Sequence, residues 1–73
     1  RLIEVTLAGD SPAVTSQKTL DELRLPDSLR VVAVVRADQP LHPTPTMHFL
    51  EHDHVVILAR EDAGDECAAA FIG

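Results

Sequence analysis

The 73-residue sequence has little of what usually stabilises a very small domain. Its single cysteine, Cys67, excludes an intrachain disulfide, and its only aromatic residues are Phe49 and Phe71. A domain of this size buries only about 60% of the surface that its unfolded chain exposes, so small folds often rely on disulfides, metals or partner subunits. Because apolar residues make up 45% of the chain, we expect a folded domain with an aliphatic core that is supplemented by self-association.

Basic residues and long apolar runs are also scarce. Six Lys and Arg residues against twelve Asp and Glu residues give a formal net charge of −6, which would repel phosphate backbones and anionic lipids. The longest apolar run, Val31 to Val35, is far shorter than the roughly 20 residues of a membrane-spanning helix. We therefore expect neither a nucleic-acid partner nor direct membrane insertion. Without a visible signal peptide, the chain is expected to be cytoplasmic, and its start at Arg1 without Met favours a fragment of a larger protein.

Motifs of catalysis are missing as well. The sequence has no Gly-rich phosphate loop, nucleophile elbow or metalloprotease helix motif. Ser11, Ser16 and Ser28 fall in polar turns. We therefore predict that the protein is not an enzyme.

Three segments have the pattern of strands. Leu2 to Leu7 alternates apolar and polar residues, which is typical of a strand with one buried face. Val31 to Val35 and the run within His54 to Arg60 are unbroken and largely β-branched, which predicts central strands with both faces covered. Arg36 is expected to end the first of them in solvent. After a turn at Asp38-Gln39-Pro40, a brief edge strand is expected at Leu41-His42, stopped by the two prolines that follow.

Two helices complete the prediction. Thr19 and Glu22 form a capping box, which predicts a short helix from Leu20 to Arg24, and Ala8 to Ser16 is expected to be a loop. A second helix is predicted over Glu61 to Ile72, with Asp62 as N-cap and an apolar stripe of Ala63, Cys67, Ala70 and Phe71. Residues 1–73 therefore predict one α+β domain of order β-α-β-β-β-α around a mixed sheet.

This order, with the residues at its joints, resembles the TrkA C-terminal domain, also called RCK_C, the C-terminal lobe of the regulator of K⁺ conductance module. The resemblance covers Leu2 to Ile72. Its motifs are Ile3-Glu4-Val5 before Ser11-Pro12, the segment Lys18 to Leu23, Val31 to Arg36, and His42-Pro43 followed by Leu50, Asp53 and Val55-Val56-Ile57. Gln17 and His52 stand where family members usually have glycine.

The resemblance implies a homodimer that senses a ligand in a groove between its subunits and regulates a potassium channel, transporter or antiporter at the inner face of the cell membrane. Candidate ligands are cyclic di-AMP or another nucleotide, or a divalent cation; no cofactor is certain. The ligand-facing candidates by position are Arg30, Val31, His42 and Pro43. The acidic and basic residues that nucleotide-binding members place after the short helix are replaced here by Arg24 and Pro26. Arg24 and Arg30 could pair with phosphates.

Two alternatives remain open. One is a plain dimerisation module with an empty groove. The other is a transition-metal site, because His48, His52 and His54 fall within seven residues together with Glu51 and Asp53. We favour a polar surface turn for this segment. The acidic residues at the start of the last helix and Cys67 on its apolar stripe are both interpreted as structural.

Overall fold

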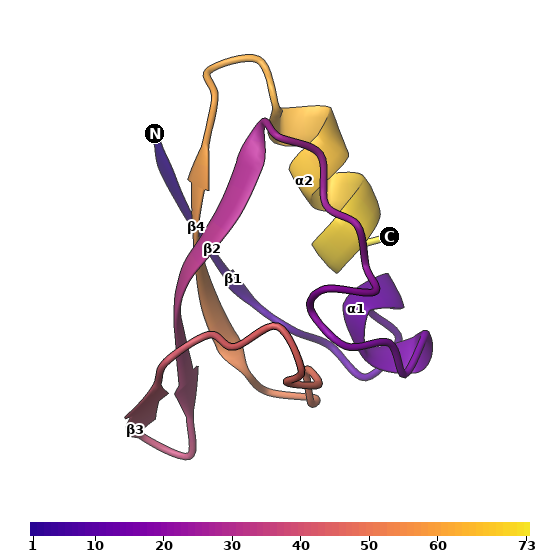
Figure 1. Cartoon of the computed structure of the whole chain (residues 1–73), viewed down its shortest axis with the longest axis vertical. Helices are drawn as coiled ribbons and strands as arrows, with labels where there is room; N and C mark the ends of the chain where they lie inside the picture. Colours follow the sequence, from indigo (N-terminus) through magenta and orange to yellow (C-terminus); the bar gives the residue numbers. More distant parts are fainter.

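A four-stranded sheet and two short helices make up the fold in the computed structural model, which describes residues 1–73 (Figure 1). The elements follow one another as β1 (Leu2–Thr6), α1 (Pro12–Thr15), β2 (Leu29–Arg36), β3 (Gln39–Leu41), β4 (His54–Ala59) and α2 (Gly64–Phe71). The strand order in the sheet is β1-β4-β2-β3, and each neighbouring pair is antiparallel. The predicted α+β domain and its order of elements are confirmed, whereas the expected mixed sheet is wrong.

The two valine-rich strands lie side by side at the centre of the sheet, as the sequence predicted. Val31 pairs with Ile57 and Val34 with Val55, and the register shifts between Val31 and Ala33. This bulge inserts one extra residue into β2. As a result Val31 and Val34, three positions apart, both face the core.

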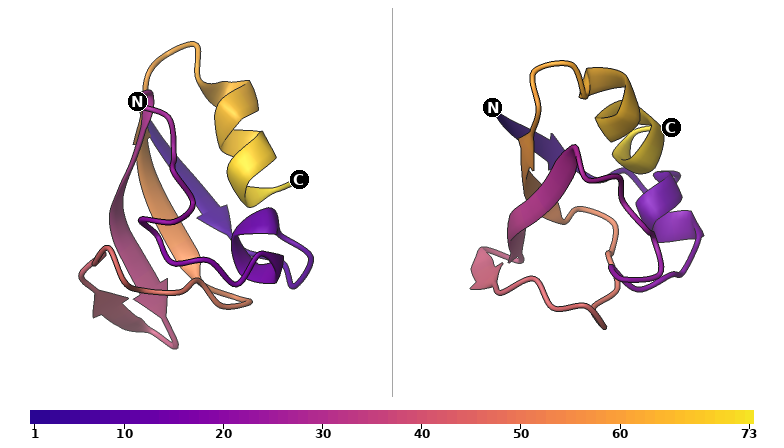
Figure 2. Two further views of the ribbon diagram at one scale, coloured as in Figure 1. Left: turned by 45° about the vertical axis from the view of Figure 1, so that its right-hand side comes forward. Right: turned by 45° about the horizontal axis from the view of Figure 1, so that its top comes forward.

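Both helices cover the same face of the sheet (Figures 1 and 2). The opposite, outer face leaves Leu2, Val32 and Leu58 exposed at 65%, 41% and 47% of their surface. The expectation that both faces of the two central strands are covered is therefore wrong for the single chain. An unbroken apolar run indicates that both faces of a strand can be buried. It does not indicate whether the second face is covered by the same chain or by another one.

A tight hairpin joins β2 to the edge strand β3. Ala37 and Asp38 both have positive φ, 50° and 64°, which is the pattern of a two-residue type I′ turn. The turn thus comes one residue earlier than predicted, and β3 begins at Gln39 rather than Leu41. The predicted edge position is confirmed, and it explains how Pro40, which has no N–H to donate, is tolerated in the strand.

The first helix is not the one that the capping box predicted. Pro12–Thr15 forms α1 within the stretch expected to be a loop, because Pro12 suits the first helical position and the Ser11 hydroxyl ties α1 to α2 by donating to the Phe71 carbonyl at 2.6 Å. The predicted helix from Leu20 to Arg24 forms only a turn. Its capping-box hydrogen bonds are present, but Arg24 leaves the helical region at a φ of 49°.

Helix α2 is shorter than the predicted Glu61 to Ile72. Its N-cap is Ala63 rather than Asp62, since the Cys67 N–H donates to the Ala63 carbonyl and no side chain caps the helix. The predicted stripe is confirmed, with Ala63, Cys67 and Phe71 buried and Ala70 packed against them. Phe71 meets Phe49 edge to face, with ring centroids 5.8 Å apart. Neither helix is long and apolar enough to cross a membrane.

Candidate functional site

A surface pocket of about 510 Å³, here called the β2 pocket, lies beside the first half of β2. The short strand β3 pairs only with the last three residues of β2, so the earlier part of that strand has no strand neighbour on this side. The turn before β2 and the segment after β3 form the other walls. The lining residues are Leu20, Asp21, Arg24, Leu25, Leu29, Arg30, Val31, Pro43 and Pro45.

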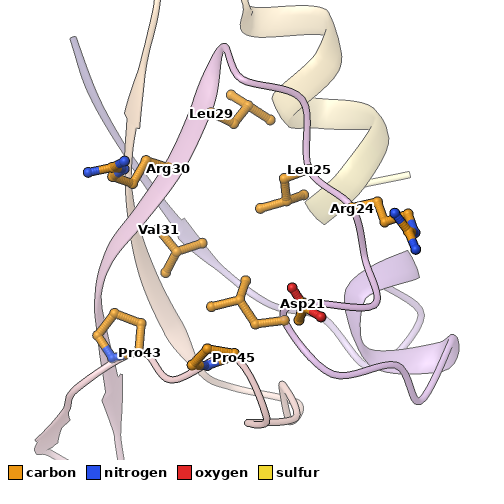
Figure 3. Close-up of a pocket in the computed structure, with 9 residues that line it drawn as sticks. Asp21, Arg24, Leu25, Leu29, Arg30, Val31, Pro43 and Pro45 are labelled. Carbon is orange, nitrogen blue, oxygen red and sulfur yellow. The ribbon is translucent and has the colours of Figure 1, made fainter.

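Six of the nine residues that line the pocket have apolar side chains. Figure 3 shows Leu25 and Val31 pointing toward each other from opposite walls, with Pro43 and Pro45 below them. These rigid rings and branched side chains make a wall that suits a flat apolar group. The volume of the pocket lies within the range of small-molecule sites.

Local hydrogen bonds hold the turn that forms the outer wall. The Leu20 N–H donates to the Met47 carbonyl at 2.9 Å and the Asp21 N–H to the Pro45 carbonyl at 3.0 Å. The Glu22 carboxylate accepts from the Thr19 N–H at 2.9 Å, while the Glu22 N–H donates to the Thr19 hydroxyl. The hydrogen bond that the carboxylate accepts from the Thr19 N–H is the main cause that lowers the pKa of Glu22. The capping box predicted from the sequence therefore fixes the pocket wall rather than starting a helix.

Charged side chains stand at the mouth of the pocket. Asp21, Arg24 and Arg30 are exposed, and none of them forms an ion pair, since the three ion pairs in the structure lie elsewhere. Figure 3 shows the Arg24 and Arg30 guanidinium groups diverging from the centre of the pocket. Arg24 also holds its positive φ at a cost of roughly 1 kcal/mol. Both guanidinium groups are exposed and unpaired, so an anion bound by either of them would lie at the rim of the pocket.

The structure brings together four of the five residues predicted to face a ligand. Arg24, Arg30, Val31 and Pro43 all line the β2 pocket, although they come from three separate segments. His42 is exposed and lies outside the lining. The prediction did not include the other five lining residues, of which four are apolar and one is an aspartate: Leu20, Leu25, Leu29, Pro45 and Asp21. Their only signal in the sequence was their closeness to the predicted positions.

A clasp at the other end of β2 was missed by the sequence reasoning. Arg36 was expected to end in solvent, but its guanidinium donates to both oxygens of buried Asp53 at 2.9 and 2.8 Å and to the His48 carbonyl. Burial by itself would raise the pKa of Asp53, but hydrogen bonds from Arg36 and the Leu50 N–H outweigh it and hold the pKa below its usual value. Asp53 also raises the pKa of Arg36 through the same hydrogen bonds.

The histidine-rich segment does not assemble into a metal centre. His54 contacts Glu4 at 2.9 Å and Thr6 at 3.1 Å on the outer face of the sheet, while His52 lies 3.9 Å from Glu51. His48 forms an isolated bridge with Thr19. No three His, Cys, Asp or Glu side chains are grouped closely enough to hold a metal ion. The alternative that used His48, His52 and His54 therefore has no geometric support, because the strand and the turn point these side chains in different directions.

The two features interpreted as structural behave as such. Cys67 is buried in the core, and burial raises the pKa of its thiol against a smaller opposite effect of Arg1. A protonated, buried thiol is a poor nucleophile. Asp65 and Glu66 occupy the first turn of α2, where Glu66 also accepts a hydrogen bond from the Ser28 hydroxyl at 2.8 Å.

The sequence and the fold define one class of protein. The model of the TrkA-C domain family matches residues 2–71, so the chain belongs to this family of regulatory domains. A comparison with curated proteins finds no match.

Solved structures with the same fold include two of BusR from S. agalactiae. One is the dimer of its RCK_C domain in complex with c-di-AMP, with a TM-score of 0.77 and 20% identity over 96% of this chain and 88% of that one. The other is BusR in complex with its busAB promoter DNA, with the same score, identity and coverage of this chain. This chain spans 35% of the BusR chain in the DNA complex. At 20% identity, the likeness establishes the fold and not the ligand.

Proposed function

We propose that this chain is a non-catalytic, ligand-sensing regulatory domain that works as a homodimer and binds a cyclic dinucleotide or a similar phosphate-bearing ligand between its subunits. The observation that carries the proposal is the β2 pocket, which combines apolar walls with unpaired arginines at its mouth. A nucleobase matches the walls, and a phosphate matches guanidinium groups.

Self-association is supported by what the single chain leaves open. Leu2, Val32 and Leu58 stay exposed on the outer face of the sheet, and the first half of β2 has no strand partner on the side away from β4. A domain of 73 residues gains stability when a second copy covers such surfaces. The RCK_C domain of BusR, which shares the fold, is a dimer with c-di-AMP, and the dimer and the ligand class proposed here agree with it.

The effector is proposed to be a potassium channel, transporter or antiporter, attached in the same chain or as a partner, with this domain at the inner face of the membrane. The membership of the TrkA-C family supports this link. A second candidate effector is a DNA-binding region, because BusR combines the same fold with promoter binding. In either case the ligand acts through its different affinity for two arrangements of the subunits.

The first test measures assembly and ligand binding on the purified domain. Light scattering during size exclusion should give twice the subunit mass of 7.9 kDa. Cyclic di-AMP at 100 times its dissociation constant should add about 2.7 kcal/mol, a rise in Tm of roughly 10 °C or more for a domain of this size. A dimer whose Tm does not respond to cyclic di-AMP, other nucleotides or divalent cations would instead identify a plain dimerisation module.

Variants locate the site. Arg24→Gln and Leu25→Ser change the β2 pocket at an exposed and a half-buried position and should each reduce the shift caused by cyclic di-AMP. His42→Ala is the matched control, because His42 is exposed and does not line the β2 pocket of the single subunit. If both pocket variants respond like the wild type, the assignment of the site is wrong. If only His42→Ala loses the shift, the ligand contacts the position that the family resemblance implied rather than the pocket.

A further inference from the structure

A second surface pocket adjoins the β2 pocket through a shared residue. It has a volume of about 290 Å³ and is lined by Asp27, Ser28, Arg30, Leu58, Ala59 and Arg60. Arg30 is the one residue that lines both pockets. Because its guanidinium is turned away from the apolar walls in Figure 3, a group bound by Arg30 would sit beside the β2 pocket rather than inside it.

The sheet places Arg60 next to Arg30. Arg30 pairs with Leu58 across β2 and β4, and the Arg60 N–H donates to the Ser28 carbonyl at 3.0 Å, which extends the ladder beyond the last strand pair. Arg60 follows Leu58 by two positions and therefore projects on the same face as Arg30. Diagonal neighbours of this kind lie about 7 Å apart at Cα, within reach of long side chains. Both residues line the second pocket, so an anion bound there would lie within reach of both side chains.

Neither arginine has a carboxylate partner. The three ion pairs of the structure involve Arg36, His52 and His54. Asp27 lines the pocket without pairing with either arginine, and the Glu66 carboxylate nearby accepts the Ser28 hydroxyl. Two neighbouring positive charges without a counter-ion repel each other, and a bound anion removes that repulsion.

We propose that Arg30 and Arg60 form a phosphate-binding subsite of the ligand whose base occupies the β2 pocket. The inference rests on the proposed function and deepens it, because it adds Arg60 and fixes the orientation of the ligand. The base lies against Leu25, Val31 and Pro43, and its phosphate lies over the paired ends of β2 and β4. A dinucleotide with two-fold symmetry would present one base and one phosphate to each subunit of a symmetric dimer.

The test compares two probes, cyclic di-AMP and adenosine, by calorimetric titration and by NMR chemical shifts respectively. Arg60→Gln should lower the affinity for cyclic di-AMP by about tenfold and reduce the salt dependence of its binding, since one charge-assisted contact is lost. Its effect on adenosine, which has no phosphate, should be less than twofold. Arg60→Lys should recover part of the loss. Lys18→Gln removes the same charge from an exposed residue that lines no pocket and should bind cyclic di-AMP like the wild type.

The outcomes separate the subsite from the proposed function. Wild-type affinity for cyclic di-AMP in Arg60→Gln, or an equal loss for both probes, would overturn the subsite and leave ligand sensing in place. No binding of cyclic di-AMP or of any other nucleotide to the wild-type dimer would overturn both. Thermal unfolding of Arg60→Gln without ligand should match the wild type at high salt, because Arg60 is exposed and makes its ladder hydrogen bond through the main chain.

Discussion

The two ends of β2 use the same residue type in opposite ways. Arg36, at the end of the strand, donates two hydrogen bonds to Asp53, whose side chain is 1% exposed. Arg30, near the start, is exposed and has no carboxylate partner. Arg36 forms a structural clasp that holds the loop before β4. Arg30 stays available at the mouth of a pocket. The role of each arginine therefore follows from the groups that the neighbouring loops place beside it rather than from its place in the strand.

The largest effect should come from opening the clasp. In Asp53→Ala, the guanidinium of Arg36 and the Leu50 N–H lose their acceptor in a largely buried place. Removing one partner of such a pair costs about 3 kcal/mol, at the low end of the buried range because a third of the Arg36 side chain is exposed. For 73 residues with a total stability of roughly 4–11 kcal/mol, this is a large share. Urea denaturation should measure it.

The control is an ion pair of similar length on the surface. Glu4 and His54 approach to 2.9 Å, but the Glu4 side chain is 65% exposed. Glu4→Ala should cost no more than about 0.5 kcal/mol. Equal losses in Glu4→Ala and Asp53→Ala would contradict the view that burial makes the clasp structural.

The clasp should also set the acid sensitivity of the fold. Because the pKa of Asp53 is lowered in the folded state, its contribution to stability is fully present above the unfolded pKa, near 4. That contribution is lost as the pH falls through the lower folded value. The free energy of unfolding of the wild type should therefore fall more steeply between about pH 5 and 2 than that of Asp53→Asn. Asp10→Asn, which removes an exposed carboxylate, should keep the wild-type slope; parallel curves for all three proteins would show that Asp53 has no part in it.

Much of the fold followed from the sequence because its strands are strongly patterned. Val31 to Val35 and the His54 to Arg60 run were placed in neighbouring central strands, and the apolar stripe of α2 was identified by its helical spacing. The errors fall where a few residues decide between local structures. The four-residue helix α1 depends on a hydrogen bond between Ser11 and Phe71, sixty positions apart, which no local pattern predicts.

The candidate site was predictable only through the family resemblance. That resemblance selected Arg24, Arg30, Val31 and Pro43, which the structure gathers in one pocket, but it also selected His42, which lies outside the lining. The clasp could not be predicted, because Arg36 and Asp53 meet only after the loop before β4 has folded back over the strand end. Its sequence signals were an aspartate directly before an apolar strand and the place of that residue, Asp53, among the motifs of the family resemblance.

The two positions where family members usually have glycine carry a small, measurable strain. Gln17 and His52 both hold positive φ, 57° and 74°, and the His52 N–H is fixed by donating to the Leu7 carbonyl. A left-handed conformation costs a non-glycine residue about 1–2 kcal/mol, while glycine costs up to about 1 kcal/mol in entropy. His52→Gly should therefore stabilise the fold by about 0.5 kcal/mol in urea denaturation. Thr46→Gly, at an exposed turn residue without positive φ, should instead destabilise it, and a gain there would contradict the strain argument.

The smallest effect on stability should come from the other end of β2. Arg30→Gln removes a charge that no carboxylate balances, so the free energy of unfolding should change by less than about 0.5 kcal/mol. At low salt the variant should be slightly more stable than the wild type, because it removes the repulsion between Arg30 and Arg60. This gain in the free energy of unfolding should vanish near 1 M salt, where the Debye length is about 3 Å. Denaturation at both salt concentrations checks this. A loss comparable to that of Asp53→Ala would mean that Arg30 is structural, and the contrast between the two ends of β2 would then disappear.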